Sequence, residues 1–172
     1  MQGVPPSHAA LSVLRDIARS GFSYAPTKAL AEAAGWDLRD DEPGLGYVRF
    51  DRRMTAESDE GCPLSVMVNG GEHPPFAYVT LAWFEDYEVE RGPFDEMFRI
   101  PYESLTSILG ESSQSGHYHQ VDWDYSFAGW TLPDCTLILV QDELDIQFGM
   151  DVSLWALPAG RLIALPVYDN LR

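Results

Sequence analysis

Positive charge is scarce in this chain. Its 172 residues include 27 aspartates and glutamates but only 11 lysines and arginines, which gives a formal net charge of −16 at pH 7. Lys28 is the only lysine, and no lysine or arginine occurs between Arg99 and Arg161. Such a chain repels the phosphates of nucleic acids and anionic lipid headgroups, so we expect neither as a partner. The charge favours a basic protein partner instead.

Long apolar runs and a disulfide framework are also missing. No stretch approaches the roughly 18 apolar residues that a membrane span needs, and the first residues show no basic segment followed by an apolar run. We therefore expect a cytoplasmic protein that does not bind a membrane. Cys62 and Cys135 are the only cysteines, and we interpret both as free thiols.

The common motifs of nucleophilic catalysis and nucleotide binding are absent. The chain has no GxSxG sequence, and Gly44-Leu45-Gly46 lacks the third glycine and the lysine of phosphate-binding loops. Several acidic residues precede Cys62, and nearby negative charge raises a thiol pKa and suppresses the reactive thiolate. We therefore assign no catalytic residue and expect no cofactor.

The chain is nevertheless apolar enough to fold, with 45% hydrophobic and 12% aromatic residues. Its length predicts one globular domain, residues 1–172. Apolar residues at helical spacing predict helices between Ser7 and Gly21, over 27–34, and between Pro101 and Gly110. Alternating or wholly apolar runs predict strands at 47–51, 64–68, 76–84 and 98–100, and a C-terminal β-meander at 121–130, 135–142, 150–157 and 162–168. This order predicts an α+β fold, a largely antiparallel sheet with N-terminal helices and one mid-chain helix, and shows no internal repeat.

Residues 116–130, GHYHQVDWDYSFAGW, raise the question of a metal site. His117 and His119 lie two residues apart, as do Asp122 and Asp124, and four such side chains could bind zinc or another divalent ion. In one continuous strand, however, the histidines would share the odd, apolar face and the aspartates would lie on the opposite face. This alternation argues against convergence, so we predict no metal site, but the sequence does not decide whether these four residues bind a metal.

Three acids, Asp142, Glu143 and Asp145, follow a strand that is apolar on both faces. Two carboxyl groups about 5 to 10 Å apart, one with a pKa raised by burial, can hydrolyse glycosidic bonds. Nothing in the sequence places these acids opposite one another. A small carboxylate- or metal-dependent hydrolase is therefore the alternative interpretation.

The first interpretation is a binding surface. The interval between Arg99 and Arg161 holds nine carboxylates, which could steer a cationic partner if they gather on an outward face. Trp130 has the same parity as the aspartates before it, which predicts an exposed aromatic anchor. The predicted partner-binding residues are Asp122, Asp124, Trp130, Asp142, Glu143 and Asp145.

In size, acidity, single-domain α+β character and lack of an export signal or catalytic motif, the chain resembles the immunity proteins of bacterial toxin systems. The resemblance implies a non-enzymatic cytoplasmic inhibitor that occludes a cationic toxin. Its carboxylates would supply charge complementarity, and Trp130 would be the anchor. The oligomeric state is not predicted.

Overall fold

The computed structural model of the chain describes residues 8–42, 45–52, 63–71, 73–84, 91–120, 123–145 and 149–165. These residues form three helices and one antiparallel sheet of eight strands, which confirms the α+β prediction. Ser7, Cys62, Asp122 and the last residues of the strand predicted at 162–168 lie outside the described residues.

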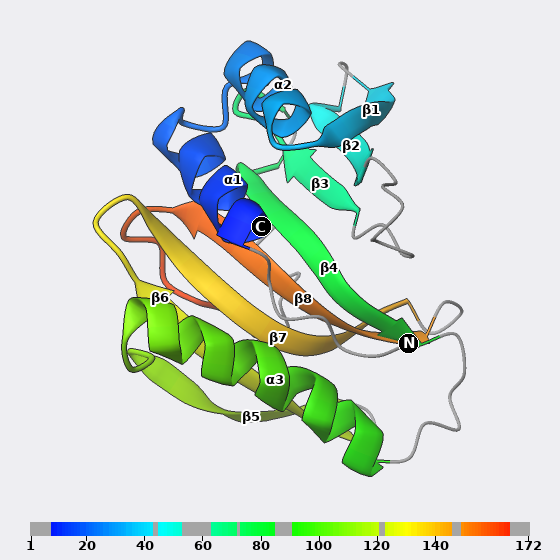
Figure 1. The fold of residues 1–172 in the computed structure, drawn as a ribbon, viewed down its shortest axis with the longest axis vertical. Coiled ribbons are helices and arrows are strands. Elements are labelled where there is room, and N and C mark those ends of the chain that lie inside the picture. Colours follow the sequence, from blue (N-terminus) through cyan, green and yellow to red (C-terminus); the bar gives the residue numbers. More distant parts are fainter. Residues whose placement is uncertain are drawn as a thin grey trace.

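The elements follow one another in a simple order along the chain (Figure 1). They are α1 (His8–Arg19), α2 (Tyr24–Ala33), β1 (Trp36–Glu42), β2 (Tyr47–Arg52), β3 (Leu64–Met67), β4 (Phe76–Phe84), α3 (Arg91–Leu109), β5 (Gln114–Gln120), β6 (Trp123–Thr131), β7 (Cys135–Asp145) and β8 (Gly149–Pro158). The spatial order of the strands is β1-β2-β3-β4-β8-β7-β6-β5.

This strand order reveals a repeated topology. A helical segment followed by a meander of four strands occurs twice. The first unit consists of α1, α2 and β1 to β4, and the second consists of α3 and β5 to β8. The two meanders join where their last strands, β4 and β8, pair antiparallel. Their first strands, β1 and β5, consequently form the two edges of the sheet. The sequence shows no such repeat, because the two halves share the order of their elements and not their residues.

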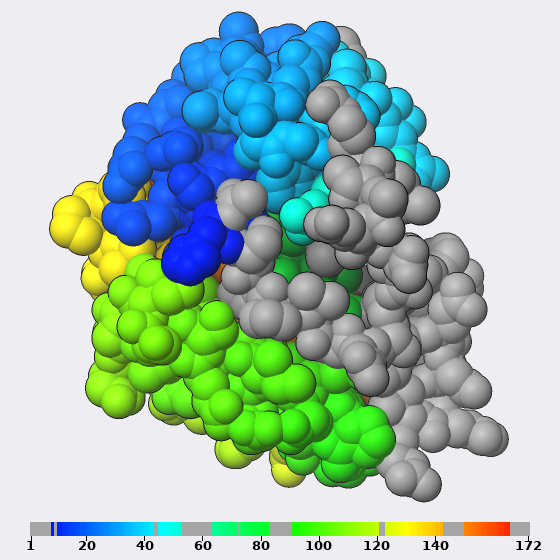
Figure 2. Space-filling view, viewed as in Figure 1, coloured from blue at the N-terminus to red at the C-terminus, as the bar shows by residue number. Residues whose placement is uncertain are grey.

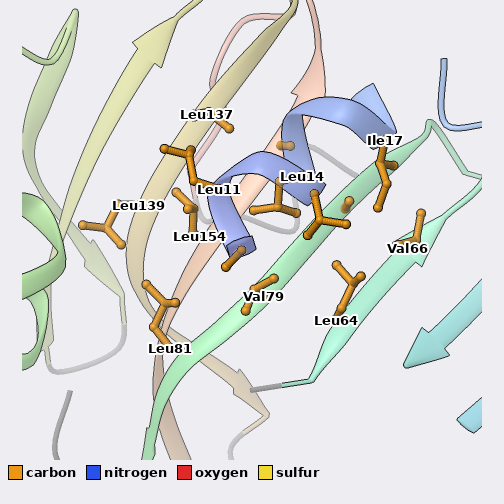
Figure 3. Close-up of a cluster of buried hydrophobic side chains, with 14 of the residues drawn as sticks. Leu11, Leu14, Ile17, Leu64, Val66, Val79, Leu81, Leu137, Leu139 and Leu154 are labelled. Carbon is orange, nitrogen blue, oxygen red and sulfur yellow. The ribbon is translucent and has the colours of Figure 1, made fainter. Parts of the chain in front are cut away.

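Helix α1 lies across the junction between the halves. Leu11, Leu14 and Ile17 recur at helical spacing and are almost completely buried. Figure 3 shows these three side chains pointing toward leucines and valines of the sheet that come from both meanders, including Val79 and Leu154. Figure 2 shows α1, α2 and α3 forming much of one surface of the molecule. The main core is therefore the layer between the helices and the sheet.

Helix α3 is longer than predicted. The sequence predicts a short strand at 98–100 and a helix that begins at Pro101, but a single helix runs through both segments. Pro101 removes one backbone hydrogen bond from this helix. Phe94, Met97, Pro101 and Leu105 are nevertheless buried on one face, and this packing against the sheet outweighs the loss. Within the described residues, no helix combines the length and apolar character that crossing a membrane requires.

The C-terminal β-meander is confirmed, with a shift in its membership. Strands β6, β7 and β8 match the predicted segments. The fourth strand is β5, which lies before the segment 121–130 with which the predicted meander begins, while residues 161–165 form no strand. Most residues of Gln114–Gln120 are polar and have low strand propensity, and pairing with β6 overrides that preference.

Candidate functional site

Two histidines lie side by side on the edge strand β5. The register of the hairpin pairs His117 with Ser126 and His119 with Asp124. Nδ1 of His117 lies 3.2 Å from Oγ of Ser126, and Nδ1 of His119 lies 2.9 Å from Oδ1 of Asp124. All four side chains therefore occupy one face of the hairpin. We call these four residues the histidine face.

The histidine face contradicts the geometry inferred from the sequence. One continuous strand was expected to separate the histidines from the aspartates, but β5 ends at Gln120 and β6 begins at Trp123 and runs back antiparallel to it. This reversal of the chain brings Asp124 beside His119. Asp122 lies outside the described residues.

The hydrogen bond to Asp124 determines the protonation pattern of His119. A carboxylate can only accept hydrogen bonds, so Nδ1 of His119 is the donor. In the neutral imidazole, Nε2 then carries the lone pair. The side chains of His119 and Asp124 are 67% and 66% exposed, so a solute can reach this nitrogen. The ring is thus oriented as a ligand or a proton acceptor.

No group of three histidine, cysteine, aspartate or glutamate side chains is arranged to hold a metal ion within the part of the chain that the structure describes. The histidine face offers two imidazoles, each tied through Nδ1 to a partner on β6. Any ion bound there would take its remaining ligands from water or from another molecule.

Trp130 is buried, so the predicted exposed anchor is wrong. Its side chain is 2% exposed, and its Nε1 donates a hydrogen bond of 2.9 Å to the carbonyl oxygen of Gly110. Tyr125 and Trp130 have opposite parity and yet belong to the same core cluster. Strict alternation fails between them because the N–H of Ser126 binds the side-chain oxygen of Gln141 at 2.8 Å, and the β6 to β7 register begins only at Phe127.

The carboxylates expected to form one outward acidic face are distributed differently. Asp142 is completely buried, while Asp124 is exposed on the histidine face. Glu143 and Asp145 belong to β7, but their side chains are not among the described ones. The predicted partner-binding residues therefore do not come together in the described part of the structure.

Asp134 forms ion pairs with two arginines, although no lysine or arginine lies near it in the sequence. Its carboxylate lies 2.9 Å from Nη2 of Arg15 and 2.8 Å from Nη2 of Arg19, both on α1. Burial alone would raise the pKa of Asp134, but the hydrogen bonds from Arg15 and from the backbone, together with the charges of Arg15 and Arg19, hold that pKa below its usual value. An acid in the cation-free interval is thus neutralised by residues far away in the sequence.

A second acidic residue lies inside the molecule beside Asp142. Asp151 is 2% exposed, and the register of β7 and β8 places it directly opposite Asp142. Among the described residues, neither carboxyl oxygen of Asp151 has a hydrogen-bond partner. Burial, and then the charge of Asp142, raise the pKa of Asp151 well above its usual value. Folding therefore favours the protonated form of Asp151.

The remaining cysteine in the described residues is unsuited to nucleophilic chemistry. Cys135 is buried at the start of β7. Burial, together with the charge of Asp134, raises the pKa of the Cys135 thiol to about 12. Its thiolate is therefore negligible near neutral pH.

The other edge strand, β1, was not predicted from the sequence. Residues 37–42 are exposed, and only Trp36 is buried. The strand carries four carboxylates, Asp37, Asp40, Asp41 and Glu42. Because β1 is the outer strand of the sheet, one side of its backbone is not paired with any other strand that the structure describes. The signal in the sequence was the glycine that ends α2, followed by a weak alternation of Trp36 and Leu38.

A surface pocket of about 290 Å³ lies next to this edge. Tyr24, Val48, Val68 and Asn69 line it, together with three glycines. The hydroxyl of Tyr24 donates a hydrogen bond to the carboxylate of Asp41, which pairs with Val48 in the sheet register. This bond, followed by burial and the charge of Asp41, raises the pKa of Tyr24. The pocket therefore combines an apolar wall with a carboxylate at its margin.

Comparison of the chain with protein families, curated proteins and solved structures finds no match.

Proposed function

We propose that this protein is a non-enzymatic binding protein that engages a basic protein through its acidic edge strand, as a cytoplasmic inhibitor of the immunity type would. The observation that carries the proposal is β1, an edge strand with four carboxylates and exposed side chains on both faces. An edge strand can extend its sheet by pairing with an extended segment of another protein. The carboxylates favour a partner segment that bears lysine or arginine.

Arg39 offsets one of the four carboxylates of β1, and the strand remains negatively charged. Arg39 lies 3.5 Å from a carboxylate oxygen of Asp40 and 3.2 Å from one of Asp51. The guanidinium of Arg52 stacks over the ring of Trp36 at 5.5 Å. These arginines are engaged within the chain, and the exposed Glu32 of α2 adds to the negative charge near Tyr24.

The pocket supports a basic side chain as the anchoring group of the partner. The stems of lysine and arginine are apolar and pack on surfaces such as those of Val48 and Val68, while the charged head stays near a carboxylate. Asp41, held by Tyr24 beside the pocket, is suitably placed for such a head. A neutral or acidic partner would gain neither interaction.

The hydrolase alternative receives less support. Of its acids, Asp142 is completely buried, and the side chains of Glu143 and Asp145 are not described. Among the described residues that line the 290 Å³ pocket, none is an acid or a histidine that could act on a substrate. The histidine face is exposed and carries no carboxylate pair.

The proposal is tested by capturing partners from the native host and reconstituting each complex with purified proteins. We expect a basic partner whose affinity falls steeply when salt is raised from about 50 mM to about 500 mM, because screening weakens charge pairs. The double variant Asp41→Asn with Glu42→Gln should weaken binding at least about tenfold. Asparagine can still accept the hydrogen bond of Tyr24, so the fold should persist, which circular dichroism would check.

The matched control is the double variant Glu103→Gln with Glu111→Gln, which removes the same charge from α3 and the residues just after it. Its affinity for the partner should stay within about twofold of the wild type. Equal losses in the two double variants would exclude β1 as the binding edge. An acidic partner, or binding that salt leaves unchanged, would contradict the proposed function itself.

A further inference from the structure

The histidine face has a feature that binding at β1 does not use. His117 and His119 project from the same face of an edge strand, at the opposite end of the sheet from β1. Each ring is engaged through Nδ1, by Ser126 and Asp124 respectively. No contact described for either ring involves Nε2. Two imidazole nitrogens thus remain available on one small surface.

We propose that Nε2 of His117 and Nε2 of His119 together bind one divalent transition-metal ion of the zinc or nickel type. Alternate residues of a strand lie about 6.5 Å apart at Cα and project in the same direction. Two ligands of a tetrahedral zinc ion are about 3.3 Å apart, given zinc to nitrogen bonds of about 2.0 to 2.1 Å. Two imidazoles at this spacing can close that gap by leaning toward each other, without a change in the backbone.

The partners on β6 strengthen the site. Metal-binding histidines commonly donate their other ring N–H to a carboxylate or another oxygen, which fixes the tautomer and the orientation of the ring. Asp124 makes this contact with His119, and the hydroxyl of Ser126 is positioned to make it with His117. The contacts of Nδ1 with Asp124 and Ser126 therefore leave Nε2 of each histidine directed away from β6.

The chemistry of the donors selects the class of ion. Neutral imidazole is a good ligand for zinc, nickel and copper, whereas magnesium and calcium prefer oxygen ligands. Within the described residues no third histidine, cysteine or carboxylate completes the site. The bound ion would therefore keep open positions for water or for a group from another molecule. This inference does not depend on the proposed function, since β1 and β5 are different edges.

The test is a calorimetric titration of the full chain, without an affinity tag, with Zn²⁺ at about 150 mM salt to screen diffuse binding to the acidic surface. We expect one strongly bound ion per chain. His117→Ala and His119→Ala should each weaken that binding at least about tenfold, because each removes one of two protein ligands. Asp124→Asn should weaken it about tenfold or more by loosening His119.

The control variant is His73→Ala, which removes an exposed histidine outside the histidine face and should leave affinity within about twofold. Nitrogen NMR of the imidazoles gives an independent readout, since Zn²⁺ should shift Nε2 of His117 and His119 and leave His73 unchanged. Absence of binding, Mg²⁺ binding as tight as that of Zn²⁺, or equal losses in His73→Ala and His119→Ala would overturn the proposal.

Discussion

The buried carboxyl group of Asp151 links the stability of the fold to pH. Its folded-state pKa is raised by burial and by Asp142, so the folded protein binds this proton more tightly than the unfolded chain does. The stabilisation is fully present below the unfolded pKa, about 3.9 for aspartate, and is lost as pH rises toward the folded pKa.

The variant Asp151→Asn should remove this dependence, because asparagine has a similar shape and cannot ionise. Relative to the wild type, its free energy of unfolding should increase with pH between about pH 5 and about pH 8.5. At the upper end we expect Asp151→Asn to be more stable by on the order of 1 kcal/mol or more, since an unpaired buried charge is costly. Urea denaturation at several pH values measures the difference.

The exposed acid Glu111 provides the control for this pH series. Glu111→Gln should change the free energy of unfolding by only a small amount, because an exposed surface charge contributes little to stability. A flat difference between Asp151→Asn and the wild type would show that Asp151 does not hold its proton in the folded state.

The burial of individual side chains was harder to predict than the helices and strands that carry them. In a regular strand, Trp130 would lie on the same face as Asp124 and would be exposed. The contact between Ser126 and Gln141 interrupts the pairing of β6 with β7, so this alternation does not hold. Asp142 was predicted at the end of a strand, whereas β7 continues to Asp145 and keeps Asp142 inside. Both errors come from long-range pairing, which one segment of sequence does not encode.

Among the loops, the connection between β1 and β2 depends on its close contact with the one between β3 and β4. A Cβ added at Gly46 would lie 2.7 Å from Cα of Gly71, and one added at Gly71 would lie 2.6 Å from the carbonyl oxygen of Leu45. Gly46 also has a φ of 77°, a conformation that favours glycine. The two loops therefore pack backbone against backbone.

Gly46→Ala should lower the free energy of unfolding by about 2 kcal/mol or more, because it adds both a clash and left-handed strain. The control is Gly92→Ala in the first turn of α3, where an added Cβ meets nothing within 4 Å and φ is not positive. That substitution should stabilise the protein by about 0.5 kcal/mol, since alanine favours helix. Urea denaturation of both variants measures the contrast, and similar effects of the two would refute the close-contact argument.

Elements with strong periodicity were predicted, and those that depend on their neighbours were not. The spacing of Leu11, Leu14 and Ile17 identified α1, and apolar runs identified β3, β4, β7 and β8. By contrast, β1 and β5 are polar edge strands with little pattern of their own. These two strands form because they pair with β2 and β6. Neither the histidine face nor the acidic strand β1 could therefore be predicted as a surface from the sequence.

The whole molecule has two meanders but one main core. Helix α1 belongs to the first half of the chain and packs on β4 of that half and on β7 and β8 of the second. Neither half can bury its apolar residues without the other. The prediction of a single domain over residues 1–172 leads us to expect one cooperative transition.

This expectation is tested by unfolding the full chain in urea and following tryptophan fluorescence and far-ultraviolet circular dichroism together. The midpoints and slopes from the two probes should coincide. Trp36 reports on the first half and Trp155 on the second, so fluorescence of single-tryptophan variants can separate the halves. Two transitions with different midpoints would show that the halves fold independently.

The position of α1 also constrains how the protein is made. Its Arg15 pairs with Asp134, 119 residues later in the chain, and its leucines pack on strands that are synthesised last. During translation, the apolar face of α1 cannot pack on β7 and β8 until most of the polypeptide has emerged from the ribosome. Contacts so distant in sequence slow folding, and the nascent chain would depend on protection by chaperones throughout that interval.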